Sequence, residues 1–314
     1  MIKYININNN NLIVSHIADV DGMGAVILAK LVFEKIDIIL CEPDELYSVF
    51  KELIGSKYDQ IFITDLSVKT EEIFEFIDSN FSNVKHFDHH IYSFDIKYPW
   101  STVIHKDGDF LPCGTSIFYE YLLKNYTECQ YLNSTYVSSF VENVRSYDTW
   151  DFKNTGNLAG KYLTEIFSVI GIDSFIEKYY SKLLKNYKLE TFTFDKDELD
   201  IVKKLEDDIA SYVDECDKSL IITQFLGYNV GISISENYRS TVGNELSARH
   251  KELDFILIAN FVRRAFSFRT VNDINLNEIA SIIGGGGHEK AAGASMNDEN
   301  LKIFYKSLYK KYDK

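Results

Sequence analysis

Three groups of aspartate and histidine in the N-terminal half have the residue types that bind divalent metal ions. In chain order they are His16, Asp19 and Asp21, then Asp65 alone, then Asp88, His89 and His90. Each group by itself has an ordinary structural explanation, because aspartates cap helices and adjacent loop histidines are usually surface residues. Taken together, carboxylate and imidazole ligands suit manganese, iron, cobalt or zinc better than calcium or copper.

Each group follows a short apolar run that predicts a β-strand. The runs are Leu12–Ser15, Ile61–Thr64 and Val84–Phe87, with a further one at Ile38–Cys41. Helical patterns at Met23–Lys35 and Thr70–Ile77 separate them, and this alternation is typical of βα units on a parallel sheet. The carboxyl ends of such strands share one edge, where ligands bind. We therefore expect these side chains to meet there: His16, Asp19, Asp21, Asp65 and His89.

A cluster of this kind has a direct chemical interpretation. Several uncompensated carboxylates close together repel one another, and a pair of divalent ions removes that repulsion. Two metals about 3.5–4 Å apart orient a bridging hydroxide and clamp an in-line displacement at phosphorus. The residues alone therefore predict metal-assisted hydrolysis of a phosphate ester.

The remainder of the chain predicts a second domain. Residues 115–147 are helical in pattern, and Asp195–Val213 has apolar residues at spacings of three and four, as in an amphipathic linker helix. Beyond it, strand patterns at 220–223, 230–235, 255–261 and 265–270 accompany helical patterns at 241–250 and 276–283. The sequence therefore predicts an α/β chain with a parallel-sheet domain, a boundary at about 190–217, and a smaller mixed α/β domain.

The charges are unevenly distributed. The 314-residue chain has 33 basic and 47 acidic residues, a net charge of −14, which does not attract long polyanions. Residues 215–314, however, balance 13 basic against 12 acidic residues and contain five of the six arginines. Arginine suits phosphate contacts. In the same region, Gly284–Gly287 lacks every Cβ, which lets backbone N–H groups approach an anion.

Composition excludes several classes of protein. With 46% hydrophobic and 25% charged residues the chain is globular rather than disordered. We find no apolar run of the roughly 20 residues that a membrane span needs and no signal-like start, so no membrane association is expected. The four cysteines are far apart, which argues against a disulfide framework and favours a cytoplasmic location.

These motifs in this order, with Gly284–His288 and Ala291–Gly293, resemble the DHH phosphoesterase superfamily and its associated C-terminal domain. The resemblance implies a Rossmann-like catalytic domain at 1–190, a helical linker at 191–217 and a substrate-binding domain at 218–314. It also implies two divalent ions, most often Mn²⁺, and relatives of this size often form homodimers.

Residue roles follow from the same resemblance. The implied metal ligands are His16 and Asp19 on one ion, Asp21, His89 and Asp148 on the other, and Asp65 on both. Asp151, three residues after Asp148, is the alternative ligand. Asp88 would orient a histidine, and His90 would contact the scissile phosphate and protonate the leaving group. The implied substrate-binding residues are Gly285, Gly286, Gly287, His288 and Arg269. His86 and His105 are expected to be structural or surface residues.

The preferred function is hydrolysis of short single-stranded oligoribonucleotides, or of small nucleotides such as adenosine 3′,5′-bisphosphate, with no long duplex as partner. Linearisation of a cyclic dinucleotide is the alternative within the family, and polyphosphate hydrolysis also stays open. Inorganic pyrophosphatase is less expected, because that branch lacks the glycine-rich motif. A non-catalytic nucleotide sensor is the alternative from another class.

Overall fold

The computed structural model describes residues 2–5, 10–33, 35–68 and 70–309. The chain divides into two compact units, Met1–Val202 and Lys203–Lys314. The division falls inside one long helix, α9 (Lys196–Lys218), which occupies most of the segment expected to be the linker. Among the described residues, no helix has the length and apolar character needed to cross a membrane.

Unit 1 contains a six-stranded sheet in the order β1-β3-β2-β4-β5-β6. Its strands are β1 (Lys3–Ile5), β2 (Asn11–His16), β3 (Asp37–Cys41), β4 (Gln60–Thr64), β5 (Val84–Asp88) and β6 (Ser101–Val103). Only the edge pair β1 and β3 is antiparallel, and the other pairs are parallel. The central strands are nearly continuous apolar runs because both faces of the sheet are covered.

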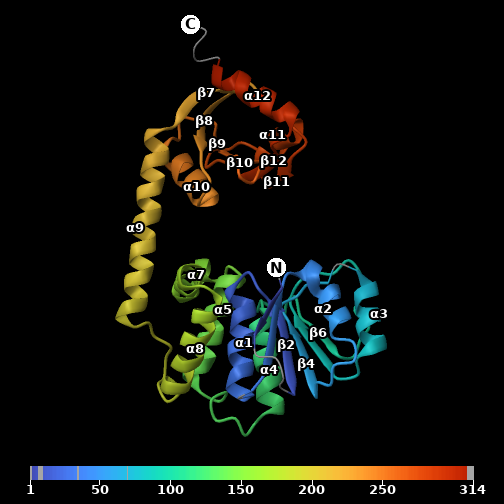
Figure 1. The fold of residues 1–314 in the computed structure, drawn as a ribbon. Helices are drawn as coiled ribbons and strands as arrows, with labels where there is room; N and C mark the ends of the chain where they lie inside the picture. Colours follow the sequence, from blue (N-terminus) through green and yellow to red (C-terminus); the bar gives the residue numbers. More distant parts are fainter. Residues whose placement is uncertain (1, 6–9, 34, 69, 310–314) are drawn as a thin grey trace. The chain divides into compact units, whose positions relative to one another are not determined.

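Helices form a layer on each face of this sheet (Figure 1). The larger layer contains α1 (Val20–Val32), α4 (Gly114–Asn125), α5 (Thr135–Asp148), α7 (Ala159–Ile170) and α8 (Ile172–Asn186). The smaller layer contains α2 (Leu46–Glu52) and α3 (Glu71–Asn80). Two short helical segments, η1 (Pro43–Glu45) and α6 (Phe152–Thr155), lie in connections.

Two of the helical segments expected from the sequence have other bounds in the structure. The helix expected from Met23 starts at Val20, because Asp19 is its N-cap and accepts a hydrogen bond from the Gly22 N–H. It ends at Val32 instead of Lys35. The helical region expected at 115–147 is two helices, α4 and α5, separated by a connection at 126–134.

Unit 2 is a mixed sheet in the order β11-β12-β10-β9-β8-β7, in which only β8 and β9 are parallel. Its elements are β7 (Ile221–Phe225), β8 (Tyr228–Ile234), α10 (Arg239–Arg249), β9 (Phe255–Asn260), β10 (Ala265–Arg269), α11 (Leu276–Ile282), β11 (Gly286–Gly287), β12 (Ala291–Ser295) and α12 (Asp298–Tyr309). One apolar core contains residues of α11 and α12, and the other contains residues of α9 and α10. The predicted α/β fold class is therefore confirmed.

Candidate metal centre

The strand register brings the predicted ligands to one edge of the unit 1 sheet. Ser15 lies opposite Thr64 in the parallel pair of β2 and β4, so His16 and Asp65 leave neighbouring strands side by side. The buried Thr64 hydroxyl donates to Ser15 Oγ at 2.7 Å and fixes this register. On the other side, the Asp65 N–H donates to the Phe87 carbonyl of β5 at 3.0 Å. Three strand ends therefore deliver their polar side chains to a common point.

The first group of potential ligands contains His16, Asp19 and Asp65, whose ligand atoms lie within 4.8 Å of one another. His16 Nδ1 is 2.7 Å from Asp19 Oδ2 and 3.5 Å from Asp65 Oδ2. The other ring nitrogen, Nε2, is 3.3 Å from Glu42 Oε2, which orients the imidazole. Asp19 performs two tasks, because its Oδ1 caps α1 while its Oδ2 faces His16.

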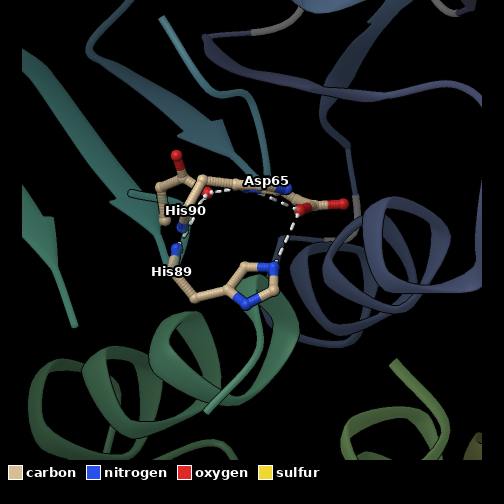
Figure 2. Close-up of side chains that lie close together, drawn as sticks. Asp65, His89 and His90 are labelled. Atoms are coloured by element: carbon tan, nitrogen blue, oxygen red, sulfur yellow. Dashed lines mark hydrogen bonds and ion pairs between the residues drawn. The ribbon is translucent and has the colours of Figure 1, made fainter. Parts of the chain in front are cut away.

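The second group contains Asp21, His89 and Asp148. His89 Nε2 lies 3.5 Å from Asp148 Oδ2 and 3.8 Å from Asp21 Oδ2. The same nitrogen is 3.6 Å from Asp65 Oδ1 (Figure 2). Asp65 therefore presents one carboxylate oxygen to each group, as a residue shared by two ions would.

Asp21 is held by the first turn of α4. Its two carboxylate oxygens accept hydrogen bonds from the N–H groups of Gly114 and Thr115, both at 2.7 Å. A Cβ at Gly114 would lie 2.8 Å from Asp65 Cβ, so glycine lets α4 approach the centre. The sequence predicts a helix start here but no partner for it, because Asp21 lies more than 90 residues away.

The electrostatics show that negative charge is concentrated here. Burial and the charges of Asp21 and Asp19 raise the pKa of Asp65 well above its ordinary value. Burial, together with Asp21, raises the pKa of Asp148 to about 7. Burial alone would lower the pKa of His16, but Asp19 and Asp65 outweigh it and raise the value to about 11. The cluster therefore favours bound positive charge.

Unsatisfied polar atoms at the same place test whether metal ions fit. In the described part of the chain, His16 Nδ1, Asp65 Oδ2 and Asp148 Oδ2 are buried and make no hydrogen bond of normal geometry. Buried polar atoms normally find a partner. Two carboxylate oxygens and one imidazole nitrogen without a regular hydrogen bond, in two groups that Asp65 links, fit a pair of divalent ions.

Asp88 orients the adjacent histidines. Its carboxylate accepts hydrogen bonds from His90 Nδ1 at 2.8 Å, from the Tyr92 hydroxyl at 2.5 Å and from the His89 N–H at 2.8 Å. Burial opposes ionisation of Asp88, but His90 and the other partners hold its pKa below the usual range. The hydrogen bond to Asp88 in turn raises the pKa of His90, whose side chain is 46% exposed. Sequence analysis missed Tyr92, although it lies only four residues after Asp88.

The remaining candidates of unit 1 lie outside the two groups. Asp151 Oδ2 pairs with Arg145 Nη2 at 2.7 Å, so the structure brings Asp148 to the cluster and not Asp151. His86 is buried and contacts Ser101 Oγ at 2.8 Å, which is a structural role. His105 is exposed, and its Nδ1 lies 2.8 Å from the His89 carbonyl oxygen.

The glycine-rich segment of unit 2 forms a short strand and is not a loop with free backbone N–H groups. Gly286 and Gly287 form β11 and pair with β12. The N–H groups of Gly285, Gly287 and His288 already donate to Ala280 O, Asn277 Oδ1 and Ala291 O. Glycine is needed instead for close packing, because a Cβ at Gly285 would lie 2.2 Å from the Gly293 carbonyl oxygen. These three N–H groups therefore have partners within unit 2, and substrate binding by Gly285, Gly286, Gly287 and His288 stays a prediction.

Arg269 lies on β10 beside α10. Its guanidinium donates to Ser240 Oγ at 2.9 Å and to the Phe268 carbonyl at 2.8 Å. Burial and the nearby charge of Arg239 lower the pKa of Arg269. Within the described ranges neither arginine has a carboxylate partner, so the pair is suited to an anion.

Comparisons with known proteins show which sequences and which fold this chain resembles. The DHHA1 domain family matches residues 238–312. The oligoribonuclease NrnB of Bacillus subtilis is 31% identical over 305 residues, which covers 93% of this chain and 74% of that protein. A 3′,5′-cyclic-nucleotide phosphodiesterase of Helicobacter pylori is 22% identical, covering 94% and 95%. The solved structure of exonuclease RecJ bound to manganese has the same fold, with a TM-score of 0.56 at 10% identity, covering 94% of this chain and 88% of that one.

Proposed function

Because the chain belongs to the DHH phosphoesterase superfamily and is a hydrolase of that family, we propose that it degrades short single-stranded oligoribonucleotides by cleaving phosphodiester bonds. The observation that carries the proposal is the pair of ligand groups that Asp65 links, because it belongs to the first group and its Oδ1 lies 3.6 Å from His89 Nε2 of the second. Such an arrangement suits a phosphodiester, whose attacking and leaving oxygens both need charge stabilisation.

Two divalent ions, with manganese the first choice, would be held by the unit 1 residues. His16 and Asp19 would hold one ion, Asp21, His89 and Asp148 the other, and Asp65 both. When bound, the ions activate water and neutralise the charge that develops at phosphorus. The role of Gly114 and Thr115 is to fix Asp21 in place through their N–H groups.

His90 is the proposed proton donor to the leaving oxygen. Asp88 accepts the hydrogen bond from His90 Nδ1, which leaves Nε2 of the half-exposed ring free to face the substrate. The hydroxyl of Tyr92 and the His89 N–H hold Asp88 in position at the same time. Asp88 therefore acts by orienting His90.

Unit 2 is proposed to hold a neighbouring phosphate or base of the substrate. The Arg239 and Arg269 pair lacks a carboxylate counterion among the residues described, which suits a substrate phosphate. Gly285, Gly286, Gly287 and His288 are proposed to line the substrate site. Among the three glycines Gly286 offers room for close approach, because a Cβ there would meet only Asn277 Oδ1 at 3.6 Å. The net charge of −14 further favours short substrates over long duplexes.

A second candidate is hydrolysis of a cyclic dinucleotide. The match along 94% of this chain to a 3′,5′-cyclic-nucleotide phosphodiesterase supports it in that both kinds of substrate are cyclic phosphodiesters. For its location we propose the reducing cytoplasm, which suits four cysteines without disulfides. A homodimer stays a prediction.

The first experiment is manganese-dependent turnover of a substrate panel followed by chromatography. The panel contains linear diadenylate, a short linear RNA, cyclic di-AMP, adenosine 3′,5′-bisphosphate and pyrophosphate, with Asp65→Ala as the blank. Faster turnover of the linear RNAs supports the oligoribonuclease, and faster turnover of cyclic di-AMP supports the second candidate. No turnover of any member by metal-loaded protein would contradict both.

A further inference from the structure

Trp150 has an unusual conformation beside the metal centre. It follows α5 two residues after Asp148, and its side chain is 61% exposed. Its backbone has φ of 63°, in the left-handed region that bulky residues rarely adopt. Such strain persists where the surrounding structure enforces it, commonly at functional sites. A strained and exposed tryptophan contributes little to the core, so its position calls for another explanation.

A small cavity connects Trp150 with the metal ligands. Its volume is about 200 Å³, and its lining contains Asp19, Asp21 and Asp148 together with Tyr147 and Trp150. All of these residues belong to unit 1. The volume is below the 300–1,000 Å³ usual for whole small-molecule ligands, which suits one flat ring system.

Neighbouring residues fix the shape of this cavity. Gly160 of α7 lines it, and a Cβ there would lie 2.1 Å from the Asn143 carbonyl oxygen, so glycine lets α7 pack directly on α5. The Trp150 ring lies 5.7 Å from the Phe152 ring, and Lys153 Nζ lies 4.2 Å from the indole centroid. Lys153 Nζ thus lies over one face of the indole.

We infer that Trp150 is a stacking platform for the nucleobase next to the scissile phosphodiester. Metal ions held by the aspartates of this cavity would attract the phosphate, and the indole that lines the same cavity offers a π-face to the attached base. Base stacking on an aromatic ring tolerates every base and needs an unpaired strand. This inference rests on the proposed function and deepens it, because it makes Trp150 a residue that selects single-stranded nucleotides over base-free phosphate esters.

Kinetics of two substitutions test this role. Trp150→Gly removes the ring and also relieves the positive φ, so the variant is expected to fold with an unchanged or higher Tm. Its KM for linear diadenylate should rise roughly ten- to hundred-fold while kcat changes little. Trp150→Phe should keep most of the affinity. For an abasic dinucleotide with the same backbone, Trp150→Gly should leave KM unchanged.

Tyr309→Ala on α12 is the matched control, because Tyr309 is a comparably exposed aromatic residue at 66%. It should leave both KM values unchanged. The inference is overturned if Trp150→Gly keeps the diadenylate KM of the wild type. It is also overturned if kcat falls equally for the dinucleotide and its abasic analogue, since that pattern indicates a structural role.

Indole fluorescence tests binding without turnover. The chain has only two tryptophans, and Trp100 donates to Asp78 Oδ1 and stacks on Phe74. In a Trp100→Phe background, with Mg²⁺ because Mn²⁺ itself quenches, AMP should quench the Trp150 emission saturably and ribose 5-phosphate should not. Quenching by AMP without turnover of any phosphodiester would refute the proposed function and keep the base site. Turnover of diadenylate without quenching would refute the base site alone.

Discussion

Asp65 combines a special backbone conformation with a special side-chain position. Its φ of 56° lies in the left-handed region, which aspartate, asparagine and glycine adopt most readily. The turn directly after β4 aims one carboxylate oxygen at His16 and the other at His89. Burial near Asp19 and Asp21 raises the pKa of this carboxyl, so its ionised form is destabilising unless cations are bound.

Asp65→Asn separates function from stability. Asparagine tolerates the same backbone but supplies only one carboxylate-like oxygen, so we expect activity to fall by more than about 100-fold and bound metal to decrease. At pH 7 the metal-free variant should have a higher Tm than the metal-free wild type. Each kcal/mol gained in the free energy of unfolding should raise the Tm by roughly 2–4 °C. Activity, metal analysis and calorimetry measure these effects.

The pH dependence has a definite sign. A carboxyl whose pKa is raised in the folded protein lowers the free energy of unfolding once the pH rises above 3.8, its pKa in the unfolded chain. The difference in Tm between the metal-free variant and the metal-free wild type should therefore widen as the pH rises. Added Mn²⁺ should raise the Tm of the wild type and not that of the variant. A metal-free Asp65→Asn protein that melts below the wild type would contradict the argument.

At the scale of elements, the glycine-rich segment shows how a short strand depends on absent side chains. β11 contains only Gly286 and Gly287, and it pairs with Gly293 and Ala292 of β12. A Cβ at Gly285 would collide with backbone at 2.2 Å, whereas one at Gly286 would meet only Asn277 Oδ1 at 3.6 Å. The neighbouring glycines therefore differ in how strongly an added Cβ would disturb the packing.

Gly285→Ala and Gly286→Ala form a matched pair. Gly285→Ala should destabilise unit 2 by about 1–3 kcal/mol, because the backbone of β12 must move. Gly286→Ala should fold normally, so any rise in its KM reports a binding role. Chemical denaturation and kinetics on linear diadenylate measure both. Equal stabilities of the two variants would show that the packing argument is wrong.

The ends of α9 and α10 are joined by charged groups. His250 Nε2 lies 2.6 Å from Asp217 Oδ1, and Arg249 Nη1 donates to Asp214 and Asp217. The hydrogen bond to Asp217 raises the pKa of His250, and His250 lowers that of Asp217. The pair therefore stabilises the folded state over a limited pH range.

His250→Gln should reveal that range. The contribution of His250 to the free energy of unfolding is complete below pH 6.5, the pKa of histidine in the unfolded chain. It is lost as the pH rises through the higher pKa that His250 has in the folded protein. The contribution of Asp217 is present above pH 3.8, the pKa of aspartate in the unfolded chain. It is lost as the pH falls through the lower pKa that Asp217 has in the folded protein. The stability difference between wild type and variant should reach about 0.5–1 kcal/mol near pH 5–6 and shrink by pH 9, as measured by urea unfolding. A difference that grows towards pH 9 would contradict the assignment.

At the scale of the whole molecule, α9 belongs to both units. Val202 is buried in the main core of unit 1, whereas Val213 and Cys216 are buried in a core of unit 2. The proposed metal ligands all come from unit 1, and five of the six arginines come from unit 2. The proposed function therefore predicts that metal binding and substrate affinity can be separated by dividing the chain.

Truncation after Lys204 keeps Val202 and removes the residues that pack in unit 2. We expect this fragment to fold and bind metal, because its own core is intact. Its KM for linear diadenylate should rise at least roughly ten-fold, through loss of the arginine contacts to phosphate. Circular dichroism, metal analysis and kinetics test this, and an unchanged KM would mean that unit 2 does not hold the substrate.

The sequence by itself determined the fold class and the strand ends that supply His16, Asp65 and His89. These features are local, because apolar periodicity predicts strands and the parallel arrangement brings their carboxyl ends to one edge. Only the tertiary structure placed Asp148 rather than Asp151 in the cluster, because Arg145 pairs with Asp151.

Three further features depend on contacts between distant parts of the chain, and only the tertiary structure shows them. It joined Asp21 to the first turn of α4, occupied the N–H groups of Gly285 and Gly287, and set Trp150 beside the acidic cavity. Each of these contacts joins segments whose partners depend on how helices pack and strands pair. No local pattern encodes such a choice, because periodicity identifies elements but not the residues that meet between them.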